Sequence, residues 1–336
     1  MKTSFVRALV TAGAASLAAI GCGTVRVSVP VMRPAEVNMA AYHSIAVGGL
    51  TGSGSHVIAG ALEESLVKSE RFVVVDRSHL DKVMRELQLS STDLADPDKA
   101  SKLGKQVTAN ALIFGNIEER YKEEKKDEPF QDSKNVRHMI HIVRGETVVT
   151  AQFKVTDVST GALIVAKTIE ERREDTNRGV DEHPKSIDRD GLGRQARQAV
   201  LAQFIRAIVP HKEYLDATFF TEGDVPQLET GIGYARRGDW KKAQDIFNEA
   251  ISAAERNPKI NSKVLGKAYW NLGLAYEYNG EYDKAGKMID KAFQLTQDGD
   301  MLAEQDNIKR LEAEARRLAE QNGKAAVAAE VVNEKP

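Results

Sequence analysis

Residues 71–89 read RFVVVDRSHLDKVMRELQL, and this stretch decides the fold. Its first part, residues 72–75, is wholly apolar and mostly β-branched, which predicts a short central strand buried on both faces. Ser78 is placed to cap a following helix, because its hydroxyl can accept a hydrogen bond from a backbone N–H of the first turn. The face that this helix buries is marked by an apolar stripe at helical spacing: Leu80, Val83, Met84 and Leu87.

Further strands and helices are expected on both sides of this stretch. Before it, residues 44–50 predict a strand, followed by a Gly/Ser-rich loop and an amphipathic helix that ends near residue 69. After it, Asp96 and Pro97 suit the cap and the first position of another helix. The remaining elements are expected to be a strand, a hairpin and a long closing helix: residues 111–117, 147–157 with 162–171, and 192–209.

Several of these segments are recognisable together. Residues 71–77 and 80–89, then Leu103-Gly104-Lys105, residues 109–115 and residues 155–161, resemble in order and spacing the signature of the CsgG family, which includes the curli-secretion lipoproteins of the outer membrane. The resemblance extends over residues 42–210 and implies an α/β domain in which helices pack on a mixed sheet. More distantly, the stretch resembles the N-terminal domain of TolB and the lipoprotein activators of penicillin-binding proteins. We expect this domain to occupy residues 42–220.

The chain departs from the secretion channels of that family at two charged stretches. In the channels, the corresponding segments enter the membrane as hairpins. Here residues 121–146 include seven charged residues in succession, and residues 170–190 begin with six. A lysine or arginine at mid-bilayer costs about 2–4 kcal/mol, and several would have to enter together. We therefore expect both stretches to be solvated loops or extensions, and we do not carry the pore function over.

The residues before position 23 have the layout of a secretory signal: a basic start, an apolar run over residues 8–20 and small residues before a cut. Cys22 is the one cysteine of the chain. Residues 19–22, Ala-Ile-Gly-Cys, resemble a lipobox, which implies that Cys22 becomes the new N-terminus and carries acyl chains. The alternative is a buried free cysteine near an ordinary signal cut.

The expected location follows from this reading. Several acyl chains anchor a protein stably, whereas a single chain binds only marginally. Gly23 follows Cys22, and by resemblance to Gram-negative lipoproteins a residue other than aspartate here favours the outer membrane. We expect a signal peptide over residues 1–21, a lipidated tether over residues 22–41, and a mature body that faces the periplasm.

Two segments of the C-terminal part resemble tetratricopeptide repeats, in which small and aromatic residues recur where helices meet. The first segment carries Tyr234, Gly238, Trp240, Ala243, Phe247 and Ala250. The second carries Leu272, Gly273, Tyr276, Gly280, Tyr282, Ala285, Ile289 and Ala292. We expect an all-α tetratricopeptide-repeat domain over residues 222–322, with a charged helix over residues 301–321 as its cap, and a disordered tail over residues 323–336.

The aromatic residues of these repeats are the candidate contacts for a protein partner. They are Tyr234, Trp240, Phe247, Tyr269, Tyr276 and Tyr282. The alternative is a plain pair of helical hairpins that binds no ligand.

Composition and motifs argue against several other classes of function. The net charge is -2 and no compact basic patch is visible, so no nucleic-acid partner is expected. The glycine-rich residues 48–55 lack both the dinucleotide spacing and the lysine of a phosphate loop. His138 and His141 have no third ligand nearby, whereas a zinc site needs three or four. We expect no catalytic residues, no cofactor and no metal.

Taken together, the sequence predicts a non-enzymatic outer-membrane lipoprotein that acts as a scaffold or assembly factor in envelope biogenesis or secretion. Its repeats would hold an envelope or secreted protein, and its α/β domain could form a homo-oligomeric ring. Two alternatives remain: a subunit of a CsgG-type secretion channel for curli or adhesins, and a lipoprotein regulator of a peptidoglycan synthase.

Overall fold

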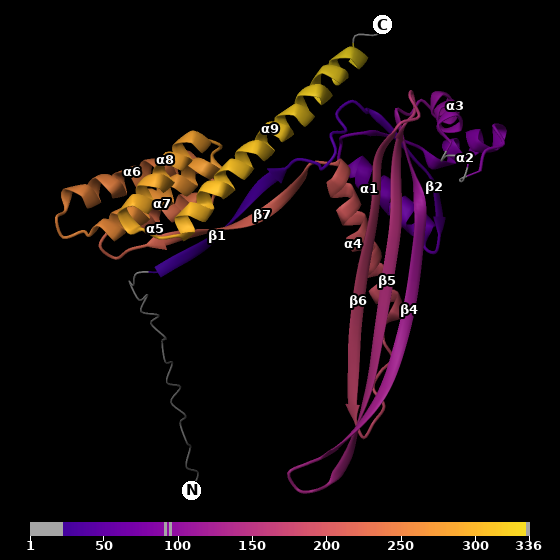
Figure 1. The fold of residues 1–336 in the computed structure, drawn as a ribbon, viewed down its shortest axis with the longest axis horizontal. Coiled ribbons are helices and arrows are strands. Elements are labelled where there is room, and N and C mark those ends of the chain that lie inside the picture. The colour runs from indigo at the N-terminus through magenta and orange to yellow at the C-terminus, as the bar shows by residue number, and fades with distance from the viewer. Residues whose placement is uncertain (1–22, 91–92, 94–95, 334–336) are drawn as a thin grey trace, which may run out of the picture. The chain divides into compact units, whose positions relative to one another are not determined.

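The computed structural model describes residues 23–90, 93 and 96–333 (Figure 1). Cys22, the expected lipid-attachment residue, lies outside them. The chain divides into two compact units, which we describe separately. The described part of the α/β unit comprises residues 32–90, 93, 96–212 and 314–333, and that of the C-terminal unit comprises residues 23–31 and 213–313.

The α/β unit is built on a five-stranded mixed sheet with the order β3-β2-β4-β5-β6. β2 (Ser44–Gly52) lies between β3 (Val73–Val75) and β4 (Ala111–Gln131) and is parallel to both. β5 (Arg137–Asp157) and β6 (Leu163–Val180) continue the sheet as antiparallel neighbours. The predicted mixed sheet is confirmed.

Helices cover both faces of this sheet near β2. α1 (Ser55–Lys68) and α4 (Arg189–Ile208) pack on one face. α2 (Arg77–Glu86) and α3 (Pro97–Val107) pack on the other. The predicted class, a mixed sheet with packed helices, is therefore correct for this unit.

The alternation of side chains along each strand sorts them into two cores. Ile113 of β4 faces α1 and α4, whereas its neighbour Leu112 faces α2 and α3. Phe153 of β5 stacks on Phe204 of α4, with ring centroids 4.1 Å apart. Both phenylalanines are fully buried, so this contact lies at the centre of the larger core.

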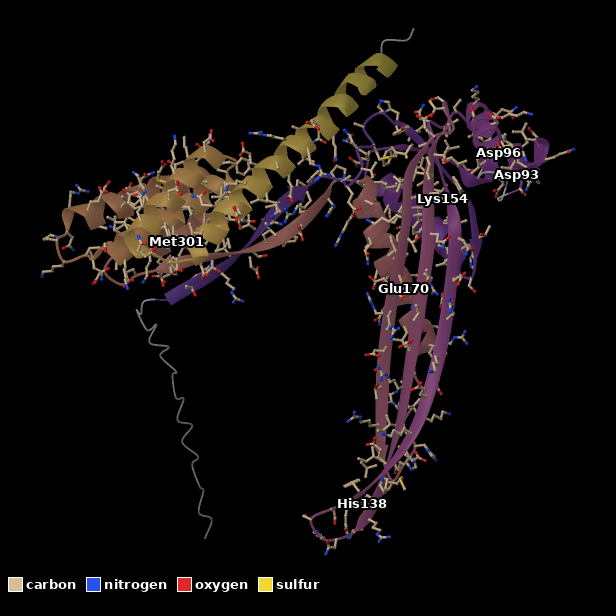
Figure 2. The ribbon with its side chains drawn as sticks, in the orientation of Figure 1. Asp93, Asp96, His138, Lys154, Glu170 and Met301 are labelled. Atoms are coloured by element: carbon tan, nitrogen blue, oxygen red, sulfur yellow. The ribbon has the colours of Figure 1, made fainter. Side chains whose placement is uncertain are left out.

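β4, β5 and β6 continue beyond the helices as a long three-stranded extension, with His138 near its far end and Glu170 partway along it (Figure 2). The loop alternative for residues 121–146 and 170–190 is wrong over most of their length. Backbone pairing of β5 with both neighbours holds these strands together, and it does not require apolar side chains. The charges instead pair with one another, either along one strand or across strands, as Arg172 does with Glu146 at 3.1 Å.

Two local predictions within residues 71–89 are also wrong. β3 is an edge strand, and the side chain of Val73 is 69% exposed. The helix begins earlier than expected, so its cap is Asp76, whose carboxylate accepts a hydrogen bond from the His79 N–H at 3.1 Å. Ser78 lies within the first turn and donates its hydroxyl to Asp76.

The C-terminal unit combines a two-stranded ribbon with a stack of helices (Figure 1). Most of β1 (Gly23–Arg33) and β7 (His211–Thr221) forms the ribbon. The helices are α5 (Gln227–Ala235), α6 (Trp240–Arg256), α7 (Ser262–Tyr278), α8 (Tyr282–Thr296) and the first part of α9 (Asp300–Asn333). None of the helices among the described residues combines the length and apolarity needed to cross a bilayer.

The tether expected over residues 22–41 is instead ordered from residue 23 onward. Val27 and Val29 of β1 are buried in the core of the C-terminal unit. Within the α/β unit, the buried Gln321 side chain holds the backbone of Ala35 through both its N–H and its carbonyl, each at 2.9 Å. This segment therefore contributes to the folded structure of each of the two units and is not a free linker.

Two boundaries also differ from those predicted. Residues 213–220, expected in the α/β domain, form part of β7 and belong to the C-terminal unit. The tail expected to be disordered from residue 323 continues α9 to Asn333. Alanines, which favour helices most strongly, are frequent over residues 325–329 and account for that continuation.

Candidate partner-binding groove

The helices of the C-terminal unit pack as predicted for tetratricopeptide repeats. Ala243 and Ala285 are fully buried where neighbouring helices meet. A Cβ atom on Gly273 of α7 would lie 2.6 Å from Ile289 Cδ1 of α8, so this pair needs a residue without a side chain. Gly238 lies in the turn between α5 and α6 and Gly280 in the turn between α7 and α8, with φ of 73° and 78°, values that favour glycine.

The ribbon packs directly on α7, which is the central helix of this unit. Asn271 is fully buried, and its side chain binds the backbone of Phe220 on β7 twice: Oδ1 accepts from the N–H and Nδ2 donates to the carbonyl, both at 2.8 Å. The indole N–H of Trp270 donates to the Thr218 carbonyl, also at 2.8 Å. Side chains of α7 therefore hold the backbone of β7, an extended strand of the same chain.

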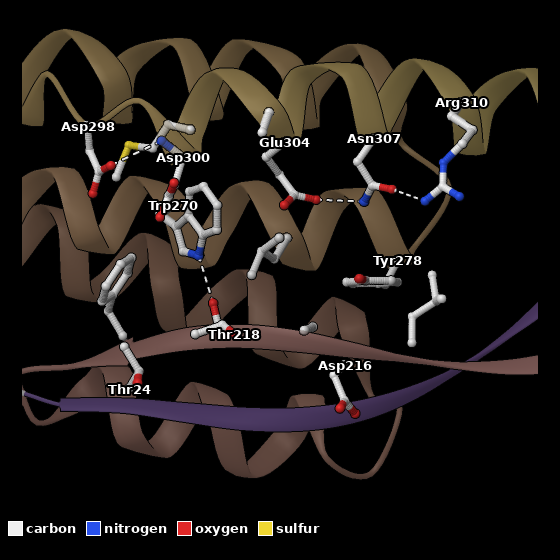
Figure 3. A pocket seen from close by; sticks show the side chains of 16 residues that line it. Thr24, Asp216, Thr218, Trp270, Tyr278, Asp298, Asp300, Glu304, Asn307 and Arg310 are labelled. Carbon is white, nitrogen blue, oxygen red and sulfur yellow. Dashed lines mark hydrogen bonds between the residues drawn. The ribbon is translucent and has the colours of Figure 1, made fainter.

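A pocket of about 570 Å³ remains beside this contact (Figure 3). β7 and Thr24 of β1 form one wall, and the first turns of α9 form the opposite wall. Its floor consists of Trp270, Leu274 and Tyr278, which are four residues apart and therefore share one face of α7. The volume lies within the range of about 300–1,000 Å³ that is usual for ligand sites.

The polar part of the pocket is predominantly acidic. Four carboxylates line it, against one guanidinium, that of Arg310. The acidic residues are Asp216, Asp298, Asp300 and Glu304. Asn307 lies between two of these groups: its Nδ2 donates to Glu304 Oε1 at 2.7 Å, and its Oδ1 accepts from Arg310 at 2.5 Å (Figure 3).

A further carboxyl group lies directly behind this wall. Glu277 of α7 is buried, and its Oε1 accepts a hydrogen bond from Asn307 Nδ2 at 2.8 Å. Burial raises the pKa of Glu277 to about 10, and the neighbouring carboxylate of Glu304 contributes to the increase, while Arg310 opposes it. Glu277 is therefore protonated at neutral pH and can donate a hydrogen bond to Glu304.

This protonation predicts a pH dependence of folding that Glu277→Gln should reduce. Because the pKa is raised above its unfolded value of 4.5, the stabilising contribution is complete below pH 4.5 and is lost as the pH rises toward 10. One titrating proton changes the free energy of unfolding by about 1.4 kcal/mol per pH unit. We expect Glu277→Gln to match the wild type near pH 4.5 and to exceed its stability at pH 8.

Urea unfolding followed by tryptophan fluorescence measures this directly, because both tryptophans, Trp240 and Trp270, lie in the C-terminal unit. Other titrating groups are shared by the two proteins, so the difference between their pH profiles isolates Glu277. Parallel profiles between pH 5 and 8 would contradict a protonated Glu277.

The residues predicted to contact a partner do not line this pocket. Phe247 is fully buried and stacks on Phe219, with centroids 6.0 Å apart, so it is a core residue and not a partner contact. The other five are partly buried and packed against the same core: Tyr234, Trp240, Tyr269, Tyr276 and Tyr282. Tyr269, for example, donates its hydroxyl to Glu255 at 3.0 Å.

The sequence did contain a signal for the pocket floor. Trp270, Leu274 and Tyr278 recur at intervals of four, a stripe distinct from that of Tyr269 and Tyr276. The wall formed by the ribbon had no comparable signal, because the pairing of β1 with β7 joins segments almost 190 residues apart in sequence.

The glycine-rich loop and the two histidines of the extension form turns and ion pairs. Gly52 and Gly54 adopt φ of 90° and 73°, so the glycine-rich loop before α1 is a turn that needs glycine. His138 contacts Asp181 through Nδ1 at 2.5 Å, and that hydrogen bond raises the pKa of the imidazole. His141 contacts Asp127 at 2.7 Å. Within the described residues, no three His, Cys, Asp or Glu side chains are grouped as a metal ion would require.

Comparison with known families gives two matches, which cover separate parts of the sequence. Residues 14–182, just over half of the chain, match the family described as curli production assembly/transport component CsgG. The chain belongs to the CsgG family. Residues 228–298 of this CsgG-family chain match the tetratricopeptide repeat. Both resemblances identified from the sequence are thereby confirmed.

Several solved structures have parts that align with this CsgG-family chain. The LpoB C-terminal domain from Salmonella enterica is 15% identical, and the alignment covers 38% of this chain and 82% of that one with a TM-score of 0.24. LpoB from E. coli is 16% identical, and the alignment covers 43% of this chain and 71% of that one with a TM-score of 0.27. Lipoprotein GNA1162 from Neisseria meningitidis is 14% identical, and the alignment covers 48% of this chain and 97% of that one with a TM-score of 0.26. No curated protein matches the chain.

Proposed function

We propose that this CsgG-family chain is a non-enzymatic lipoprotein scaffold of the outer membrane that holds a protein partner in the groove of its C-terminal unit. The partner would be an envelope or secreted protein, and the work of the scaffold would be envelope assembly or secretion. The CsgG match supports the envelope assignment, and the repeat match supports protein binding.

One observation carries the binding proposal: the pocket between the ribbon, α7 and α9 is open although the adjacent face of α7 is already occupied. Asn271 and Trp270 bind the chain's own β7, so a partner cannot use those hydrogen-bonding groups. Leu274, Tyr278 and the first turns of α9 line the space that remains. A partner segment would therefore lie against the ribbon and not replace it.

The membrane anchor gives a prediction for Cys22. If Cys22 is acylated, cells should incorporate labelled palmitate into the protein, and the protein should partition into detergent. Cys22→Ala removes the thiol that carries the chains, and with them a contribution of about 0.8 kcal/mol per buried methylene. We expect the variant to be found in the soluble periplasmic fraction or to stay uncleaved. Unchanged membrane partitioning of Cys22→Ala would refute the anchor.

Partner binding is tested by filling the pocket. Ala303 is exposed on α9 and lines the pocket, so Ala303→Trp should obstruct it without disturbing the core. We expect affinity purification from detergent-solubilised envelopes to recover a partner with the wild type and to lose it with Ala303→Trp. Lys287→Trp on the exposed face of α8 is the matched control and should keep the partner. Equal recovery with both variants would place binding elsewhere.

The channel alternative is favoured by the family match and by the length of β4, β5 and β6. Against it, residues 122–128 near the end of β4 are all charged, and they include Lys122 paired with Glu124 at 2.5 Å and Lys126 paired with Glu128 at 2.6 Å. A scaffold should give no stable conductance in planar bilayers. Discrete conductance steps that vanish when residues 121–146 are deleted would favour the channel.

A further inference from the structure

The pocket in the C-terminal unit has an excess of negative charge that the chain itself does not neutralise. Within the described residues, no lysine or arginine forms an ion pair with Asp216, Asp298, Asp300 or Glu304. Arg310, the cation of the lining, donates to the neutral amide of Asn307. Three of the four acidic residues are on the loop before α9 or on its first turns. The charge is therefore concentrated along one wall.

The floor of the pocket is aromatic and apolar. Trp270 is 7% exposed, and its N–H is already bonded to Thr218, so its ring is fixed and offers only carbon surface. Leu274 and Tyr278 extend this surface along α7. Tyr278 in turn packs on Trp240, with ring centroids 5.5 Å apart, which holds its ring in place.

An acidic wall facing an aromatic floor selects a particular kind of ligand. A lysine or arginine side chain has an apolar stem that can lie on aromatic carbon and a cationic end that can reach carboxylates. An anionic group would be repelled by four carboxylates. A purely apolar group would take water from those carboxylates and return no hydrogen bond, which is unfavourable.

We propose that this pocket takes a basic side chain, lysine or arginine, from an extended segment of the partner protein. The inference rests on the proposed function, because it names the chemistry of the segment that the same groove would bind. The basic side chain lies along Trp270 and Leu274, and its cationic end is bound by Asp300 and Glu304. Arg310, at the far end of the same wall, limits the site to one or a few basic residues.

Peptide binding to the purified full-length chain in detergent tests this chemistry. The probes are short, fluorescent, acetylated and amidated Gly/Ser peptides that carry two arginines, or two glutamines, or two glutamates at the same positions. At about 50 mM salt we expect the arginine peptide to bind about tenfold more tightly than the glutamine peptide, and added salt to reduce the difference. The glutamate peptide should bind most weakly.

Charge-neutral variants then assign the effect to the pocket. The double variant Asp300→Asn/Glu304→Gln should weaken binding of the arginine peptide by about tenfold. Arg310→Gln removes the competing cation and should strengthen binding severalfold, a direction that mere damage to the fold would not give. Glu249→Gln, on the exposed face of α6, is the matched control and should change nothing.

Three outcomes would overturn the inference: equal affinity for the arginine and glutamine peptides, no response to the double variant, or weaker binding by Arg310→Gln. Spermidine that competes as well as the arginine peptide would point to a free organic cation instead of a protein segment. If Ala303→Trp abolishes partner recovery while Asp300→Asn/Glu304→Gln does not, the groove binds a partner but not through a basic side chain. If Ala303→Trp has no effect on recovery, the proposed function itself fails.

Discussion

Asn271→Leu should lower the stability of the C-terminal unit by about 3 kcal/mol, because it leaves two backbone groups of one buried contact without partners. Asn271 is fully buried, and its amide satisfies both the N–H and the carbonyl of Phe220. Leucine has a similar volume, so packing changes little and the effect measures the lost hydrogen bonds. The ribbon, which depends on this contact, should separate from α7 at a lower temperature than in the wild type.

Tryptophan fluorescence during heating measures this loss, since Trp240 and Trp270 both report on the C-terminal unit. For a unit of this size, 3 kcal/mol corresponds to a decrease in Tm of at least about 10 °C. Asn248→Leu, on the exposed face of α6, is the matched control and should leave Tm nearly unchanged. A Tm for Asn271→Leu within a few degrees of the wild type would show that the two hydrogen bonds between Asn271 and Phe220 contribute little to stability.

Ala285→Leu should destabilise the same unit by about 3 kcal/mol for the opposite reason, overpacking. Ala285 is fully buried between α8 and α7. Its carbonyl oxygen would lie 3.5 Å from a Cβ placed on Gly273, so the two helices are closely packed here and leave no space for a larger side chain. The larger side chain forces α8 away from α7, and the groove beside α7 should lose its partner.

The α/β unit should remain folded in Ala285→Leu, because its cores contain no residue of α7 or α8. Hydrogen exchange distinguishes the two units: protection should fall across α7 and α8 and persist at Phe153 and its neighbours in β5. Lys287→Leu, exposed on the same helix, controls for hydrophobicity. Global loss of protection in Ala285→Leu would contradict two independently packed units.

Much of this architecture was predictable because the pattern is local. The stripe from Leu80 to Leu87, the cap at Asp96 and the small residues Ala243 and Ala285 each encode a contact within one element or between neighbouring elements. β3 was predicted at the wrong place in the sheet because the place of a strand depends on tertiary structure. A run of valines fits an edge strand as well as a central one, and only the sheet order decides.

The pairing of distant segments was not predictable. β1 was interpreted as a tether because nothing nearby indicates its partner, β7. The charged parts of β4 and β6 were interpreted as solvated loops or extensions because of their runs of charged residues, although β5 supplies backbone partners to both strands. The candidate site shows the same contrast. Its floor on α7 follows a helical stripe that is visible in the sequence, whereas its wall on β7 depends on long-range strand pairing that is not.

Site-specific photo-crosslinking from Ala303 in living cells tests most directly whether the C-terminal groove holds a protein partner. A photoreactive residue at this position faces the pocket, and the same residue at Lys287 on α8 serves as the control. We predict one discrete crosslinked protein from position 303, none from position 287, and loss of the adduct when Ala285→Leu is combined with the probe. Absence of an adduct at position 303, or the same adduct from both positions, would contradict a partner-binding groove.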